Sequence, residues 1–117
     1  MKDIENDFGD LFYHNGDASL ILDAVRDMAE HLGHSLENPI SLSLVCLNLA
    51  IPAKIADDIS VEIFREFNKQ NEQIDYDTMK KIIIRFLPEA KKFSEISIKA
   101  FLKGVAKSKY PDIEPFI

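Results

Sequence analysis

The sequence is poor in the residues on which most recognisable catalytic and cofactor sites depend. It has only 4 glycines, and none belongs to a glycine-rich phosphate loop or to a G-x-S-x-G turn around a serine nucleophile. The single cysteine, Cys46, has no partner for a disulfide. Because Cys46 lies in an apolar segment, where burial disfavours the thiolate, we expect a core residue rather than a nucleophile. We therefore expect no catalytic residue, no cofactor and no enzymatic activity.

Long apolar runs are also missing. No stretch approaches the roughly 18–20 residues that a membrane span needs, and the acidic first residues lack the basic and apolar regions of a signal peptide. The hydrophobic share of 46% and the charged share of 29% are typical of a soluble folded protein. A chain of 117 residues has room for one core but not two. We therefore predict a single cytoplasmic domain over residues 1–117.

The longest uncharged segment lies between Pro39 and Pro52 and shows two periodicities. Its first apolar residues alternate with serines, as in a strand. A second apolar set recurs at helical spacing, namely Ile40, Leu44, Leu47 and Ile51. Asn38 is a good N-cap and Pro39 suits the first helical position, whereas no other segment could pair with a strand. We predict a buried helix beginning at Pro39.

The flanking segments are charged and amphipathic, which is typical of surface helices. Apolar residues recur at helical spacing over residues 3–14, 17–32, 52–70, 75–87 and 89–108. Gly33 is expected to end the helix over residues 17–32, and Pro88 to break the chain after the helix over residues 75–87. Asp75 or Asp77 is expected to cap the helix over residues 75–87. Small residues in the last helix would allow another helix to approach closely.

Residues 110–117 are predicted as an extended C-terminal tail that packs back on the domain through its apolar side chains. No other segment reads as a strand or as a repeat. The predicted fold is all-α, a single compact bundle of five to six helices.

The candidate ligands for a metal ion are His31 and His34, with Asp27 one turn before His31. Zinc needs three or four ligands in tetrahedral geometry, and Gly33 is expected to end the helix between the two histidines. The alternative is a pair of surface histidines beside a helix C-terminus, where positive charge is favourable. We therefore predict no metal, and a metal-dependent enzyme is the weakest of the functional hypotheses.

The net charge of −6 conceals an uneven distribution. Residues 1–78 carry −11 and residues 79–117 carry +5. Such asymmetry concerns association rather than fold. On the second helix, three carboxylates recur at i, i+4 and i+7, opposite the apolar face, and two more lie in the first segment. The predicted partner-binding residues are Asp7, Asp10, Asp23, Asp27 and Glu30; the alternative is a solvated surface without a partner.

A second charged stripe runs along the last predicted helix. It consists of Lys92, Lys99, Lys103 and Lys107. These lysines could contact phosphates, or they could offset the acidic helices of the same fold. No aromatic platform or nucleic-acid-binding motif accompanies them. A helical regulatory or nucleic-acid-associated subunit using the Lys92–Lys107 stripe is therefore the alternative function.

Small size, acidity and the absence of catalytic motifs together favour a protein that binds another protein. In character the chain resembles bacterial toxin-immunity proteins and acidic phage inhibitors, although no motif ties it to one family. We predict an inhibitor that neutralises a basic toxin, such as a nuclease, by covering its active or substrate-binding surface. A homodimer through Val61 or the apolar tail is left open.

Overall fold

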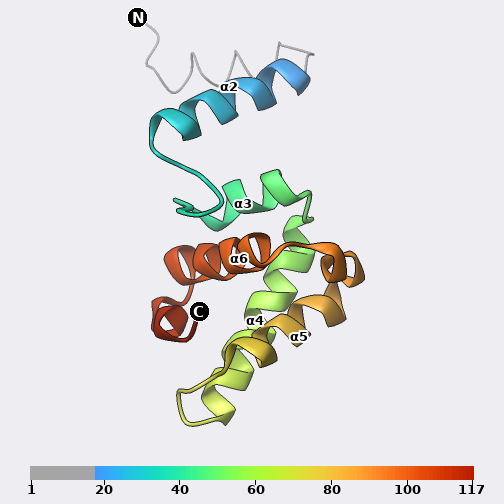
Figure 1. The fold of residues 1–117 in the computed structure, drawn as a ribbon, viewed down its shortest axis with the longest axis vertical. Helices are drawn as coiled ribbons and strands as arrows, with labels where there is room; N and C mark the ends of the chain where they lie inside the picture. Colours follow the sequence, from blue (N-terminus) through green and yellow to red (C-terminus); the bar gives the residue numbers. More distant parts are fainter. Residues whose placement is uncertain (1–17) are drawn as a thin grey trace, which may run out of the picture. The chain divides into compact units, whose positions relative to one another are not determined.

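The computed structural model describes residues 18–117, all of whose regular elements are helices (Figure 1). In chain order they are α2 (Ala18–His31), α3 (Leu42–Leu49), α4 (Ala53–Lys69), α5 (Tyr76–Phe86), the 3₁₀ helix η1 (Pro88–Lys92), α6 (Glu95–Ser108) and the 3₁₀ helix η2 (Pro111–Phe116). The predicted all-α helical bundle is confirmed. The helix predicted over residues 3–14 lies outside the described residues. Within residues 18–117, no helix has the length and hydropathy of a membrane span.

The chain divides at the end of α2. Leu32 is the last residue of the compact unit that contains α2, and Gly33–Ile117 form the other unit. Gly33 has a φ of +89°, the left-handed conformation expected of the glycine that ends a helix. The single domain over residues 1–117 stays a prediction.

The second unit is built around a core to which α3, α4, α5 and α6 all contribute. Helix α3 packs on α6, α4 runs along α5, and η1 and η2 pack on α5 and α6 respectively. The largest fully buried apolar side chains are Phe101, Ile59, Ile63, Met79, Ile83, Ile98, Leu102, Ile113, Val45 and Val105. One buried hydroxyl, that of Ser60, donates to the carbonyl oxygen of Ala56 at 2.7 Å, so its burial leaves no unpaired polar group.

Local sequence explains where most helices begin and end. The Asp75 carboxylate accepts the Thr78 N–H at 2.7 Å, so the predicted cap of α5 is confirmed. A hydrogen bond from the Thr78 side chain, together with this one from the Thr78 N–H, lowers the pKa of Asp75. The predicted break at Pro88 is also confirmed, because α5 ends at Phe86.

The last predicted helix, residues 89–108, is divided in two. A 3₁₀ turn ends at Lys92, and α6 begins at Glu95. The Ser94 hydroxyl accepts the Ser97 N–H at 3.1 Å and is the N-cap of α6. Because an N-cap residue has extended rather than helical backbone angles, Ser94 interrupts the helix that the apolar spacing predicted as continuous.

Helix α3 begins at Leu42, three residues later than predicted. Ser41 is the N-cap, and its hydroxyl accepts the Leu44 N–H at 3.2 Å. The Ile40 N–H instead donates to His34 Nδ1 at 3.2 Å. The predicted cap, Asn38, uses its backbone N–H to bond the Ser35 hydroxyl at 3.0 Å. These loop hydrogen bonds hold the residues around Pro39 outside the helix.

The predicted buried face of α3 is consequently wrong. Leu42 and Val45 are buried, whereas Leu47 is 55% exposed. Of the predicted apolar set, only Ile51 is buried. The helix begins two residues after Ile40, and its Leu42–Val45 side is the one that α6 covers. Helix α3 thus leaves apolar side chains in contact with solvent.

The C-terminal residues are helical rather than extended. Two prolines, Pro111 and Pro115, lie within η2, whose Ile113 is fully buried. Tyr110 stacks on Phe64 of α4, with 4.5 Å between the ring centroids. Proline fixes φ near the value that a 3₁₀ turn requires, so both prolines are compatible with η2, and the buried Ile113 holds this turn on the core.

Two helices approach each other closely at Gly104, where α6 meets the first residue of α3. A Cβ atom placed on Gly104 would lie 2.9 Å from Leu42 Cα and 3.3 Å from Leu42 N. Helix α3 can rest on α6 at this distance only because residue 104 has no side chain. The prediction that small residues of the last helix allow close approach holds at this position.

We expect Gly104→Ala to lower the free energy of unfolding by about 1–3 kcal/mol, because the added methyl group collides with backbone. The intrinsic helix preference acts in the opposite direction and favours alanine by about 1 kcal/mol. Urea denaturation followed by far-UV circular dichroism measures the sign. Lys107→Ala, an exposed change on the same helix, is the control and should have little effect. A Gly104→Ala protein that is more stable than wild type would contradict the close contact.

Ala50, which follows α3, provides a second stability test. Its φ of +55° and ψ of +43° are left-handed, a conformation that costs a non-glycine residue about 1–2 kcal/mol. We expect Ala50→Gly to stabilise the protein by roughly 0.5–1 kcal/mol. Glycine removes the cost of the left-handed conformation, but part of this gain is lost because glycine is more flexible in the unfolded chain. Thermal denaturation should show a higher midpoint for Ala50→Gly and a lower one for the control Ala53→Gly, which lies in helix α4. A lower midpoint for Ala50→Gly would contradict the left-handed C-cap.

Candidate functional site

The three described members of the predicted acidic face lie together on α2. Asp23, Asp27 and Glu30 are all exposed and follow one another at i, i+4 and i+7. They lie opposite the best-covered stripe of α2, in which Ala29 is buried and Ile21 and Val25 are half-buried. Asp7 and Asp10 lie outside the described residues, so their part in this face stays a prediction.

Only one of these carboxylates has an ion pair. Asp23 Oδ1 lies 3.4 Å from Arg26 NH1, and both side chains are mostly exposed. Within the described part of the chain, no cation pairs with Asp27 or Glu30. Both carboxylates stand near the C-terminal end of α2, where the helix dipole disfavours negative charge. Asp27 and Glu30 are therefore an electrostatic cost to α2 that no ion pair with a described residue offsets.

Helix α2 also exposes apolar side chains that the sequence predicted to be covered. Met28 is 48% exposed and Leu32 is 69% exposed. Leu22, on the other side of the covered stripe, is exposed as well. The surface of α2 thus carries carboxylates on one side and exposed large apolar groups on other sides.

The predicted lysine stripe is not carried by one continuous helix. Lys92 belongs to η1, whereas Lys99, Lys103 and Lys107 lie on α6 beyond the Ser94 cap. The Lys103 ammonium donates to the Glu37 carbonyl oxygen at 3.0 Å. The Lys99 ammonium lies 5.7 Å from the centre of the Tyr76 ring, within the range of a cation–π contact.

Tyr76 is part of the same neighbourhood. Its hydroxyl is enclosed and lies next to the Glu95 carboxylate. This burial raises the pKa of Tyr76, and the nearby Glu95 carboxylate adds to the effect. Glu95 Oε2 also forms an ion pair with Lys80 Nζ at 3.6 Å. The basic side of α6 is therefore engaged in contacts within its own unit.

The His34 side chain forms hydrogen bonds through both of its ring nitrogens. Its Nδ1 accepts the Ile40 N–H, and its Nε2 donates to Asn48 Oδ1 at 2.8 Å, which fixes the neutral tautomer with the proton on Nε2. Both ring nitrogens are thus occupied in joining the loop before α3 to α3 itself. Among residues 18–117, no three His, Cys, Asp or Glu side chains are grouped so that they could hold a metal ion.

A cavity that the sequence did not predict lies between α3, the start of α4 and the end of α6. Its volume is about 490 Å³. Five apolar side chains line it: Leu42, Leu47, Ile51, Ala53 and Ala56. The polar part of the wall comes from Cys46, Asp57, Ser108 and Lys109, together with Ser43.

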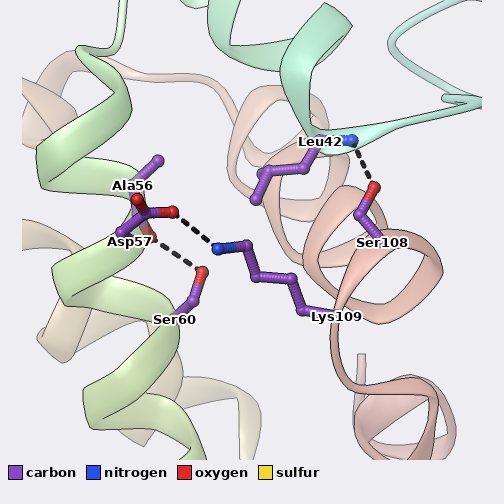
Figure 2. A network of polar contacts seen from close by, with 6 residues as sticks. All are labelled: Leu42, Ala56, Asp57, Ser60, Ser108 and Lys109. Atoms are coloured by element: carbon purple, nitrogen blue, oxygen red, sulfur yellow. Dashed lines mark hydrogen bonds and ion pairs between the residues drawn. The ribbon is translucent and has the colours of Figure 1, made fainter.

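Two hydrogen-bonded contacts fix the polar side of this cavity (Figure 2). Lys109 Nζ donates to Asp57 Oδ1 at 2.6 Å and so joins the end of α6 to α4. The Ser108 hydroxyl accepts the Leu42 N–H at 3.0 Å and joins α6 to the start of α3. The cavity therefore lies where three helices are tied to one another.

Cys46 is half-buried on the wall of this cavity rather than in the centre of the core. Burial raises the pKa of its thiol and the Asp57 carboxylate raises it further, whereas the Lys109 ammonium lowers it. The thiol is thus held in its protonated form, which agrees with the prediction that burial disfavours the thiolate.

Comparisons of this chain with protein-family models, with curated proteins and with solved structures find no match.

The opposite influences of Asp57 and Lys109 on Cys46 can be measured, because Cys46 is the only thiol of the chain. We expect Asp57→Asn to lower the thiol pKa and shift the pH profile of alkylation by iodoacetamide to lower pH. We expect Lys109→Met to raise the pKa and shift the profile to higher pH. The rate follows the thiolate fraction, so a stopped-time mass-spectrometric assay suffices. Shifts in the same direction for both variants would indicate changed burial and contradict the electrostatic account.

Proposed function

We propose that this protein acts by binding another protein and has no catalytic activity of its own. In this proposal it is a cytoplasmic inhibitor, comparable to bacterial immunity proteins, that neutralises a basic toxin such as a nuclease. It does so by covering the active or substrate-binding surface of the toxin. The observation that carries the proposal is the exposed surface of α2, where unpaired carboxylates accompany exposed apolar side chains.

The electrostatics of α2 favour a basic partner. Asp27 and Glu30 are like charges one turn apart, near the negative end of the helix dipole, and no described cation neutralises them. Each such unfavourable interaction costs a few tenths of a kcal/mol. Lysine or arginine side chains of a partner would remove this cost, and the same charge complementarity would accelerate the encounter.

The exposed apolar side chains lie on a different side of α2 from these carboxylates. Met28 is on the flank of the apolar side, and Leu32 follows the helix on the side of Ile21 and Val25. A partner whose contact extends from the carboxylates around the helix to Met28 would bury apolar surface as well as neutralise charge. The proposal therefore assigns the apolar side chains to affinity and the carboxylates to association rate and specificity.

The alternative, a nucleic-acid-associated subunit, finds less support in the geometry. Two of its four lysines, Lys99 and Lys103, already contact groups of their own unit. Binding of phosphate would have to compete with these contacts. The two remaining lysines lie on different helices.

The proposal predicts the effect of reversing the charge of the acidic face. The triple variant Asp23→Lys, Asp27→Lys, Glu30→Lys should associate with a basic partner roughly 10- to 100-fold more slowly at low ionic strength, because electrostatic steering is lost. The partner is obtained by co-purification with the tagged protein from its native host, and association is followed by stopped-flow fluorescence. Far-UV circular dichroism should remain helical.

A matched control separates local charge from net charge. The variant Glu37→Lys, Glu72→Lys, Glu89→Lys has the same formal net charge but places the changes on exposed positions of the second unit. It should retain most of the wild-type association rate and should still inhibit the activity of the partner. Equal rates for the two triple variants would contradict the assignment of the contact face to α2.

A further inference from the structure

The cavity between α3, α4 and α6 has the size and the lining of a ligand site. Its volume of about 490 Å³ falls within the range of roughly 300–1,000 Å³ that small-molecule pockets occupy. Such pockets are mainly apolar and carry a few polar groups that set the orientation of the ligand. Here the apolar lining includes the buried side chains of Leu42, Ile51 and Ala56.

The polar groups define which head group the ligand should carry. Lys109 and Asp57 form an ion pair, so together they add no net charge to the site. The ammonium has further N–H donors and the carboxylate has further lone pairs. A group that accepts from Lys109 and donates to Asp57 would satisfy both without breaking their contact. An amide does this with its carbonyl oxygen and its N–H.

Charged head groups fit this site less well. A carboxylate near Lys109 would also lie near Asp57, and an ammonium near Asp57 would also lie near Lys109. In each case an attractive interaction is accompanied by a repulsive one. Burial and Asp57 also raise the pKa of the Cys46 thiol, so this part of the wall adds no charge at neutral pH. The site therefore favours an uncharged ligand.

From this arrangement, we infer that the cavity binds an apolar group joined to an uncharged amide, with the apolar group between Leu42, Ile51 and Ala56 and the amide at the Asp57–Lys109 pair. Two sources share this chemistry. One is a small organic amide, and the other is a leucine-like side chain of a peptide with its flanking backbone amides. The inference is independent of the acidic face of α2.

The inference is tested with three probes of equal shape and different charge: isocaproamide, isocaproate and isohexylammonium. Binding to the full-length ¹⁵N-labelled protein is followed by amide chemical shifts. We expect isocaproamide to shift the signals of cavity residues such as Leu47 and Ala53. It should bind about two- to fivefold more tightly than either charged probe, because each charged head group meets one like charge of the Asp57–Lys109 pair, and the 61% and 34% exposure of these side chains screens the repulsion in part. Equal binding of all three probes, or no shift at the cavity, would overturn the inference.

Two variants locate the site. Ala53→Trp, at an exposed position of the lining, should fill the cavity and weaken isocaproamide binding about tenfold, as expected when an apolar pocket is lost. Val61→Trp, exposed on the same helix and outside the lining, should bind like wild type. Lys109→Met should weaken binding of the amide while the circular dichroism spectrum stays helical. Unchanged binding in both Ala53→Trp and Lys109→Met would overturn the assignment.

The two sources of the amide are distinguished by N-acetyl-leucinamide, which carries the same isobutyl side chain between two amides. Tighter binding of this probe than of isocaproamide supports the inference with a peptide as the natural occupant. Tighter binding of isocaproamide supports it with a small amide as the occupant. Absence of binding by both would overturn it.

Discussion

The close contact between Gly104 and Leu42 positions α3 on α6. A Cβ of residue 104 would lie 2.9 Å from Leu42 Cα, so α3 can approach α6 this closely only because residue 104 is a glycine. The Ser108 hydroxyl fixes the same end of α3 through the Leu42 N–H, and His34 fixes the loop before it. Once α3 is placed by its Leu42–Val45 side, Leu47 must face solvent, and the cavity with Cys46 on its wall follows.

Helices whose ends are marked by local chemistry were predictable from the sequence. Asp75 caps α5, Pro88 ends it, and Gly33 follows α2 in a left-handed conformation. These signals act between residues close in the chain, so neighbouring sequence is sufficient to determine them. The helical class of the central segment was predicted correctly for the same reason.

The predictions for the start and the buried side of α3 were wrong. In the first case two local N-cap signals competed, and in the second a contact with a distant helix determined which side is buried. Asn38 and Ser41 are both good N-caps, and the loop hydrogen bonds of His34 select Ser41. The buried side of α3 depends on α6, which follows it by more than forty residues, so spacing within α3 alone could not reveal it. The cavity was unpredictable for this reason too, because three separated helices line it. The acidic stripe of α2, in contrast, is a property of one helix and was visible in the spacing of its carboxylates.

The two surfaces differ in what they offer a partner. The surface of α2 presents unpaired charge on one side and exposed apolar groups on other sides, whereas the cavity presents the Asp57–Lys109 ion pair beside an apolar pocket. Charge complementarity governs how fast a partner arrives, and burial of apolar groups governs how long it stays. In the proposed function, the described part of this chain supplies both kinds of contact.

Hydrogen–deuterium exchange of the protein alone and in complex with the proposed basic partner tests the central claim most directly. The account predicts that binding slows exchange in peptides that cover Ala18–Leu32, because the partner covers the acidic face of α2. Unchanged exchange over Ala18–Leu32, with protection confined to the Lys99–Lys107 side of α6, would contradict it.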